Sequence, residues 1–350
     1  MTGADRLFAR CRKGAGRFLA VVTMIAAAAL PHGAWADQID PPGRATEQVV
    51  EVQNSFDDLF GTELRGPRKY ASPLGQQLAA VANAAQGRIG VAAMDLTTGR
   101  MVDVLGDQRF PMASTSKIAI AATFLEGVDK GKWSLSSEFP LMVPVASRPF
   151  SSAVAPVRPG EYMTAQRLIE LMITRSNNYA TDALLKVVGG PKAVNAWIER
   201  AGVDDWHIDR DIATLVRDDG AIDPARVVDK RDSATPKAMV TLLAGIYQGK
   251  WLSPSSRKVL LGAMSRCITG KRRIPAGLPA GVQVSHKTGS LNNTSSDVGI
   301  IETPDGRVFA IAIYVTGQGG RPGREARIAS IARTIYNGYL SEGPTRTASR

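Results

Sequence analysis

The sequence predicts an α+β protein, in which an antiparallel sheet is flanked by N- and C-terminal helices and an all-helical lobe is inserted in the middle. Three observations predict it. Strand patterns occur at 88–105 and again at 283–315, the stretch at about 112–280 has mainly helical spacing, and a helical segment at 324–339 follows the last strand. Strands from both ends can pair only if the helical stretch is an insertion, so we expect two lobes with a groove between them.

The first 36 residues are typical of a secretory signal. A basic start precedes an apolar run from Phe18 to Leu30, and Ala34-Trp35-Ala36 supplies the small-x-small cleavage pattern. That run is too short to span a bilayer, and no later run is longer. We therefore expect export to the periplasm or the outside, with no stable membrane span after cleavage. The expected divisions are a signal at 1–36, a linker or N-terminal extension at 37–71, a folded domain at 72–340 (α/β lobe 72–109 and 281–340, helical lobe 110–280) and a disordered tail at 341–350.

Each element follows from a local pattern. From Ser72, apolar residues keep helical spacing until Gln86-Gly87, and the turn Thr97-Thr98-Gly99 joins two predicted strands. Gly189-Gly190 ends one helical segment of the middle region. The predicted strands are Arg88–Leu96, Arg100–Leu105, Gln283–Lys287, Val298–Glu302 and Val308–Val315, and the predicted helices are Ile118–Glu126, Ala165–Thr174, Tyr179–Val188, Val194–Ala201, Pro236–Tyr247 and Arg324–Tyr339.

Charge and rare residues exclude several classes of protein. The net charge of +11 suits anionic substrates, and equally a generally solvated basic surface. The basic cluster Lys271-Arg272-Arg273 lacks an aromatic-interleaved stripe or a DNA-binding motif, so no nucleic-acid partner is expected. After signal cleavage Cys267 is the only cysteine, which excludes an intramolecular disulfide, and His207 and His286 are too few soft ligands for a typical catalytic zinc. We expect a monomer with no metal and no cofactor.

A possible nucleophile lies at the start of a helical run. Ser114-Thr115-Ser116-Lys117 places Ser114 and Lys117 one turn apart on the same face of the predicted helix. A serine hydroxyl becomes nucleophilic when a neighbouring base takes its proton, and a lysine does so where its surroundings keep it neutral. The helix N-terminus would offer N–H groups to a developing oxyanion. Alone the pattern is weak, because Ser255-Ser256-Arg257-Lys258 repeats it on what we interpret as a solvated helix face.

Two further polar motifs follow along the chain. Ser176-Asn177-Asn178 falls between two helical segments, where it projects from a turn or simply caps a helix. Lys287-Thr288-Gly289-Ser290 ends a predicted strand, where the glycine could equally mark an ordinary turn. Each motif has a purely structural explanation when taken alone. Their order, each on a suitable element, favours a single catalytic site.

Together the three motifs resemble those of the penicillin-recognising serine enzymes, which include class A β-lactamases and penicillin-binding proteins. The resemblance covers about Leu74 to Leu340. It implies a β-lactamase/transpeptidase-like fold, and a small β-lactam or a peptidoglycan-like peptide as substrate. Further similar segments are Phe110-Pro111-Met112-Ala113, Arg231-Asp232-Ser233-Ala234-Thr235-Pro236 and Asp297-Val298-Gly299-Ile300.

The resemblance also implies roles for matching residues. Ser114 would attack the carbonyl, Lys117 would take its proton, and Ser176 would relay a proton to the leaving nitrogen with Lys287 nearby. We therefore expect Lys117 to lie within hydrogen-bond reach of Ser114, with Ser176 and Lys287 converging on the same groove. Asn178 would hold the acylamide side chain of the substrate. The substrate carboxylate would be bound by Thr288 and Ser290, and the oxyanion hole would be formed by the N–H groups of Ser114 and Ser290, with Gly289 allowing close approach.

One loop departs from the family. Class A β-lactamases have a loop that reads roughly D-R-x-E-x-x-L-N, whose Glu and Asn hold the water that hydrolyses the acyl-enzyme. In the matching stretch 209–216, Ile212 and Val216 replace that Glu and Asn, and neither side chain can activate water. Asp211, one residue earlier, is the possible deacylation base. The alignment also predicts an ion pair between Arg210 and Asp232 at the base of the loop, and slow hydrolysis of the acyl-enzyme.

Three functions remain open on these grounds. The first is a serine hydrolase of class A β-lactamase type that is acylated at Ser114. The second is a D,D-peptidase or related amidase or esterase, for which the missing Glu would be expected. The third is a cell-wall sensor that is acylated and does not turn over. What happens after Ser114 is acylated distinguishes them.

Overall fold

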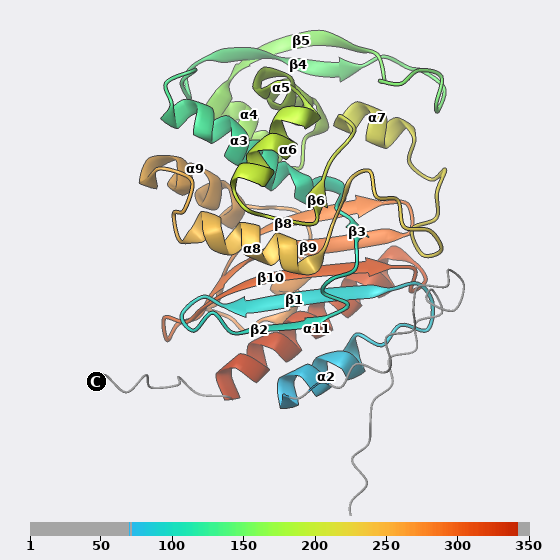
Figure 1. Ribbon diagram of the computed structural model, residues 1–350, viewed down its shortest axis with the longest axis vertical. Coiled ribbons are helices and arrows are strands. Elements are labelled where there is room, and N and C mark those ends of the chain that lie inside the picture. Colours follow the sequence, from blue (N-terminus) through green and yellow to red (C-terminus); the bar gives the residue numbers. More distant parts are fainter. Residues whose placement is uncertain (1–69, 71, 342–350) are drawn as a thin grey trace, which may run out of the picture. The chain divides into compact units, whose positions relative to one another are not determined.

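The computed structural model describes Tyr70 and residues 72–341, all within the compact unit that spans Val49–Arg350. The predicted signal (1–36), nearly all of the predicted extension (37–71) and the tail from 342 onward lie outside the described residues. Figure 1 shows that the described chain forms a sheet covered by helices on both faces, with further helices stacked beyond one of them. No helix in the described part of the chain is both long and apolar enough to cross a membrane.

The central sheet confirms the predicted pairing of the two ends of the chain. The early strand Ile89–Asp95 pairs antiparallel with the late strand Val308–Thr316, from Ile89 opposite Val315 to Asp95 opposite Phe309. The other neighbouring strands of this sheet also pair antiparallel. In spatial order the five strands are β2 (Met101–Val104), β1 (Ile89–Asp95), β10 (Val308–Thr316), β9 (Thr294–Glu302) and β8 (Gln283–Leu291).

Helices from both ends of the described chain cover one face of this sheet. The helix α2 (Pro73–Val81) begins at Ser72, whose hydroxyl accepts the Gly75 N–H, and it packs against α11 (Arg321–Ser341). The opposite face is covered by α8 (Pro236–Tyr247), which contacts β1 and β10 (Figure 1). Since α8 packs on the sheet, it belongs to the α/β layer and not to the helical lobe predicted at 110–280.

The remaining long helices form the second lobe. They are mutually packed around a shared apolar core, and the predicted bounds of α4 (Ala165–Thr174) agree with the structure. Asn177 caps α5 (Asn178–Val188) by accepting the Ala180 N–H, and Gly189 ends this helix in the left-handed region at φ 105°. These helices are α3 (Lys117–Asp129), α4 (Ala165–Thr174), α5 (Asn178–Val188), α6 (Pro191–Arg200) and α9 (Pro254–Ser265).

The inserted lobe is not all-helical, which corrects the prediction. A hairpin of β4 (Glu138–Pro144) and β5 (Val157–Thr164) lies across its far side, and its three internal or terminal prolines hid the strand pattern. Proline is tolerated there because both strands of a two-stranded sheet are edges. A second small sheet joins three two-residue strands: β3 (Phe110–Pro111), β7 (Ser233–Ala234) and β6 (Trp206–His207).

The motif strand β8 is longer than predicted. It runs through the Lys-Thr-Gly-Ser segment to Leu291, which pairs with Thr294 across a tight turn. Asn293 in that turn is left-handed, with φ 48°. The predicted end at Lys287 was wrong because polar residues can continue a strand where it pairs with a neighbour. The motif therefore lies on a rigid, hydrogen-bonded edge strand of the sheet.

Candidate active site

Ser114 lies in a single 3-10 turn, Ala113–Ser116, which leads directly into α3. The residue before it, Ala113, has φ 49°, an uncommon backbone conformation of the kind often held at functional sites. Thr115 and Ser116 donate their hydroxyls to backbone carbonyls at 2.8 and 2.9 Å and are buried. Among the hydrogen bonds of the described residues, none uses Ser114 Oγ, and this side chain is partly exposed. Of the three hydroxyls, that of Ser114 is the one available to a substrate.

Lys117 is fully buried at the start of α3, and its amine turns toward α5. Its Nζ donates to the Asn178 Oδ1 at 2.7 Å, to the Ser176 carbonyl at 2.8 Å and to the Ser176 Oγ at 3.3 Å. The predicted direct hydrogen bond to Ser114 is not among the hydrogen bonds of the described residues. Burial and the nearby charge of Lys287 lower the pKa of Lys117 well below its usual value. This eases the loss of one of the three donated protons, which leaves the lone pair that a proton acceptor needs.

Lys287 of β8 approaches Ser176 from the side of the sheet. Its Nζ donates to Ser176 Oγ at 2.9 Å and to the Thr288 carbonyl at 2.8 Å. Burial lowers the pKa of Lys287 to about 8, against opposing charges on Cys267 and Asp297. Ser176 itself has φ 56°, another uncommon conformation, just before the cap of α5. One hydroxyl is therefore held between two buried amines, each on a different element.

Glycine at 289 is required by the close approach of β8 to the nucleophile turn. A Cβ there would lie 2.4 Å from the Ser296 Oγ and 2.6 Å from the Met112 carbonyl oxygen. Any larger residue would push the strand away from the turn that carries Ser114. The absence of a side chain thus lets the backbone of Ser290 approach the nucleophile turn, where the predicted oxyanion hole needs it.

Thr288 and Ser290 follow Lys287 on β8, and Arg273 joins them from a distant segment. The Arg273 Nη2 donates to Ser290 Oγ at 2.7 Å, and its Nη1 donates to the Gly289 carbonyl at 2.8 Å. Arg273 is only 1% exposed, because it also pairs with Glu325 of α11 at 3.3 Å. In the sequence it stood out only as part of the basic cluster Lys271-Arg272-Arg273. The sequence of this cluster does not indicate that Arg273 is buried, because its burial depends on contacts with distant segments.

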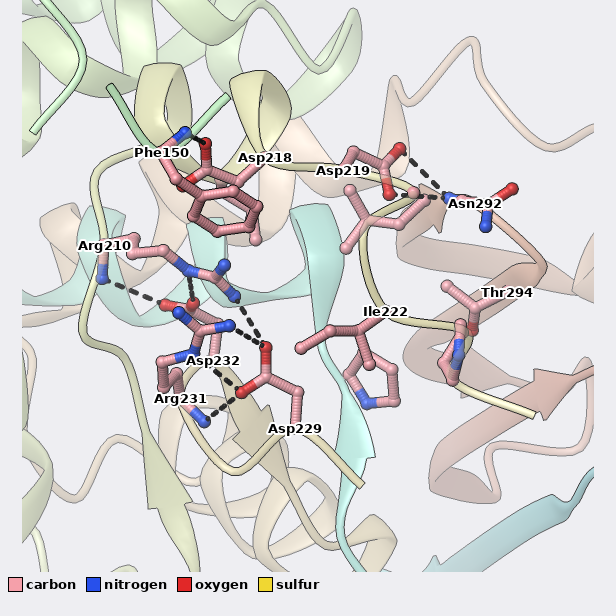
Figure 2. Close-up of a pocket in the computed structure, with 15 residues that line it drawn as sticks. Phe150, Arg210, Asp218, Asp219, Ile222, Asp229, Arg231, Asp232, Asn292 and Thr294 are labelled. Atoms are coloured by element: carbon pink, nitrogen blue, oxygen red, sulfur yellow. Dashed lines mark hydrogen bonds and ion pairs between the residues drawn. The ribbon is translucent and has the colours of Figure 1, made fainter. Parts of the chain in front are cut away.

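The base of the 209–232 loop is closed by ion pairs (Figure 2). Arg210 Nε lies 2.6 Å from Asp232 Oδ2, which confirms the predicted pair. The contact is not bidentate, because the other arm of the guanidinium pairs with Asp229 at 3.2 Å. Asp232 also accepts the Asp209 and Arg210 N–H groups at 3.0 and 3.2 Å. A small pocket beside this network is lined by Phe150, Ile222 and Asn292 among others, and it contains none of the serine-site residues.

The loop then enters the short helix α7 (Ile212–Arg217), which Asp211 caps by accepting the Thr214 N–H at 2.8 Å. Ile212 is buried and Val216 is half exposed. The first two N–H groups of α7, those of Ile212 and Ala213, donate to the two carboxylate oxygens of Asp182 at 2.7 and 2.8 Å.

Asp182 was missed by the sequence reasoning, although it lies one helical turn after Asn178. Burial raises the pKa of Asp182 to about 7, and the charge of Asp211 adds to this, against the two backbone hydrogen bonds and the charge of Lys117. Asp182 therefore links the loop to the Lys117 side of the site. The i, i+4 spacing from the Ser-x-Asn motif was the available signal.

Known proteins match most of this chain. A family model described as "Beta-lactamase enzyme family" matches residues 73–339. The β-lactamase Toho-2 of Escherichia coli is 30% identical over 298 residues, which is 84% of this chain and 99% of that protein.

Solved structures are similar to most of this chain as well. A β-lactamase from Chitinophaga pinensis is 30% identical, with a TM-score of 0.67, over 77% of this chain and 100% of its own. A structure titled PBP-A is 28% identical, with a TM-score of 0.66, over 79% of this chain and 99% of its own. Both likenesses cover more than three quarters of this chain.

Proposed function

Because the chain belongs to the class A β-lactamase family, we propose that it is a serine hydrolase that is acylated at Ser114 by β-lactams and hydrolyses their amide bond. The observation that supports this most directly is the hydroxyl of Ser176 held between the amines of Lys117 and Lys287 beside an available Ser114. This arrangement can move a proton from the nucleophile to a leaving nitrogen without a metal.

In acylation, the neutral amine of Lys117 takes the Ser114 proton as Oγ attacks the β-lactam carbonyl carbon. The carbonyl oxygen becomes an oxyanion that accepts the N–H groups of Ser114 and Ser290. As the carbon–nitrogen bond breaks, Ser176 donates its proton to the nitrogen and recovers one from Lys117. The charge of Lys287, 2.9 Å from the Ser176 Oγ, lowers the cost of an anionic Ser176 during this relay.

Substrate binding uses the edge of β8. Thr288 and Ser290 would donate to the substrate carboxylate, and the charges of Lys287 and Arg273 would offset it. Arg273 supports this role because its guanidinium already lies 2.7 Å from the Ser290 Oγ. Asn178 would hold the acylamide group through its amide nitrogen, since its oxygen accepts from Lys117.

Deacylation should be slow. Ile212 and Val216 are apolar where the family has the residues that hold the water, and general-base assistance typically accelerates such a step by about 10²- to 10⁴-fold. Asp211 is the proposed source of any remaining base catalysis. It caps α7 by accepting the Thr214 N–H, and the first N–H groups of the same helix donate to Asp182, so it lies at the loop side of the site. Asp211→Asn keeps the helix cap and removes the acidity, so it should slow deacylation and leave acylation unchanged. Equal deacylation rates in the two proteins would exclude Asp211.

The same apolar pair, Ile212 and Val216, favours a second candidate function: a D,D-peptidase or related acyltransferase of the penicillin-binding type, or an acylated sensor. A chromogenic cephalosporin and a D-Ala-D-Ala peptide, offered in parallel, test the alternatives. Sustained hydrolysis of the cephalosporin that disappears in Ser114→Ala supports the β-lactamase. Release of D-alanine with one equivalent or less of cephalosporin opened supports the peptidase, and neither product supports the sensor.

We also propose that the protein is exported as a monomer after removal of residues 1–36. The support is the basic start, apolar run and Ala34-Trp35-Ala36 pattern of the sequence. N-terminal sequencing of the expressed protein should begin at Asp37, and the particle mass in solution should be that of one chain. An intact N-terminus in the cytoplasmic fraction would contradict export.

A further inference from the structure

The 209–232 loop is attached at its start to the helical side of the serine site. Asp182 of α5, which lies one helical turn after Asn178, accepts the first two N–H groups of α7 at 2.7 and 2.8 Å. The Thr214 hydroxyl of α7 accepts the N–H of Ala155, in the segment between β4 and β5, at 2.8 Å. These contacts hold α7 on the side of the site that carries Asn178.

Two further contacts attach the same loop to the turn that ends the substrate-binding strand β8. Both carboxylate oxygens of Asp219 accept the Asn292 N–H, at 2.9 and 3.0 Å (Figure 2). The Asn293 Nδ2 donates to the Asp223 Oδ1 at 2.8 Å. We call these two contacts, Asp219–Asn292 and Asp223–Asn293, the loop anchor. Because both acceptors are carboxylates, each contact is stronger than a hydrogen bond between neutral groups.

Asn293 fixes the loop anchor to the sheet and to α11. Its side-chain oxygen accepts the Arg324 Nη1 of α11 at 3.3 Å, and its carbonyl accepts the N–H of Gly317, which follows β10, at 3.0 Å. Arg324 is buried and also donates to the Ser295 Oγ of β9 at 3.2 Å. The loop is therefore joined to the hydrogen-bonded core of the α/β layer, and the loop as a whole bridges the helical side and the sheet side of the serine site.

Little free space remains between the loop and the end of β8. A pocket of about 50 Å³ lies behind the loop anchor, and its apolar lining includes Leu215, Ile222 and Leu291. This volume suits a few water molecules, whereas a cavity that holds a benzene-sized ring has about 150 Å³. Asp219 and Asn292 both line the pocket, so their separation would enlarge it.

The chemistry of a β-lactam directs its acylamide side chain toward the loop anchor. In the proposed acylation step, the carbonyl oxygen accepts the N–H groups of Ser114 and Ser290, and the carboxylate lies at Thr288. A β-lactam carries its carboxylate on the nitrogen side of that carbonyl and its acylamide on the other side. The acylamide therefore extends along β8 away from Thr288, past Ser290 toward Asn292, with Asn178 beside it.

We propose that the loop anchor determines substrate specificity, so that the site accepts β-lactams with a slender acylamide side chain and excludes those with a rigid, branched one. A thienylacetyl group can bend away from the loop at its CH₂ group. An aminothiazolyl methoxyimino group has both substituents on one trigonal carbon, and this rigid unit needs more room than the pocket behind the anchor provides. The proposal rests on the proposed function, because it names the substrate class of that site.

The first experiment tests the loop anchor in the free protein, without any β-lactam. Hydrogen exchange of the full chain is followed by mass spectrometry in the wild type, in the double variant Asp219→Ala/Asp223→Ala and in Asn293→Asp. The last variant sets a second carboxylate against Asp223 and keeps an oxygen for Arg324. Asp204→Ala, which removes an exposed carboxylate outside the loop, is the control.

Residues 216–228 should exchange about 10-fold faster in both anchor variants than in the wild type, because the charge-assisted hydrogen bonds that close the loop are lost. The control should exchange as the wild type does, and a cooperative thermal transition shows that each variant is folded. Unchanged exchange of this segment in a folded anchor variant would overturn the proposal.

The second experiment compares the rates at which cephalothin and cefotaxime acylate Ser114, measured by intact-protein mass spectrometry. The two cephalosporins share their nucleus, carboxylate and 3-acetoxymethyl group and differ only in the acylamide side chain. The wild type should be acylated at least about 100-fold faster by cephalothin. Both anchor variants should lower this ratio about 10-fold, through faster acylation by cefotaxime and little change with cephalothin.

Equal rates for the two cephalosporins with the wild type would contradict the proposal even if no variant folds. A ratio that is the same in the wild type and a folded anchor variant, or that changes equally in Asp204→Ala, would contradict it too. If neither compound acylates the wild type, the proposed function is refuted instead, and the exchange experiment still decides whether the anchor holds the loop.

Discussion

Asp182→Asn is the substitution whose effect the structure defines most closely. Asp182 is 5% exposed, and burial raises its pKa to about 7, whereas an aspartate in the unfolded chain titrates near 3.8. Between about pH 4 and 7, the folded protein therefore holds a proton that the unfolded chain has lost. Stability falls as the pH rises through this window and levels off above it. A shift of about three pKa units corresponds to about 4 kcal/mol.

An asparagine does not titrate, but it offers one acceptor oxygen where the aspartate accepts two N–H groups, those of Ile212 and Ala213. Asp182→Asn should therefore cost about 1–3 kcal/mol at pH 4 through the lost hydrogen bond. From pH 4 to pH 8 its stability relative to the wild type should then rise by up to about 4 kcal/mol. Urea unfolding at intervals from pH 4 to 8 measures the difference. The substitution also removes a charge that raises the pKa of Lys117, so the acid limb of acylation should move to lower pH.

A stability difference that stays constant across this range would refute the reasoning. It would mean that Asp182 is ionised throughout, with its charge fully compensated by the N–H groups of Ile212 and Ala213. Asp211→Asn is the matched control. The side chain of Asp211 is partly exposed and caps the same helix, so its removal should give no comparable pH-dependent gain.

Three further predictions concern the rest of the site. Asp232→Asn removes the charge of the closest partner of the partly buried Arg210 guanidinium and should cost about 3 kcal/mol of stability; a melting temperature within 1 °C or so of wild type would contradict the ion-pair argument. Gly289→Ala should slow acylation by about 10²-fold or more, because its Cβ would displace β8 from the nucleophile turn, and an unchanged rate would show that the strand can give way. Because the pKa of Lys287 is about 8, penicillin binding should weaken above pH 8 as the charge is lost, whereas a neutral penicillin ester should show no such limb; identical profiles would exclude Lys287 as the anion-binding charge.

The predictable parts of the fold were those with local signals. Thr164 and Thr235 cap α4 and α8, and the structure has these helices at Ala165–Thr174 and Pro236–Tyr247, as the apolar spacing predicted. The pairing of β1 with β10 followed from topology alone, since strands at both ends had to meet across an insertion. The β4–β5 hairpin was missed because its partly exposed strands show no clean alternation and contain proline.

The site was predictable where a motif carries the chemistry. The three motifs placed Ser114, Lys117, Ser176 and Lys287, and the structure brings the last three into one hydrogen-bonded chain. The expected Ser114–Lys117 hydrogen bond was not found, because the buried amine turns toward acceptors on Ser176 and Asn178.

What sequence alone could not supply were contacts between distant segments. Arg273 reaches Ser290 only because Glu325 of α11 neutralises it within the core. Asp182 reaches α7 only because the loop folds back over α5.

Intact-protein mass spectrometry after brief exposure to benzylpenicillin tests the central claim most directly. The wild type should gain one penicilloyl group on Ser114 within seconds and lose it slowly, while Ser114→Ala should gain none. The adduct should outlast the free antibiotic, because Ile212 and Val216 cannot activate water. Complete turnover with no adduct at any time would contradict slow deacylation, and an adduct that forms equally on Ser114→Ala would contradict the assignment of the nucleophile.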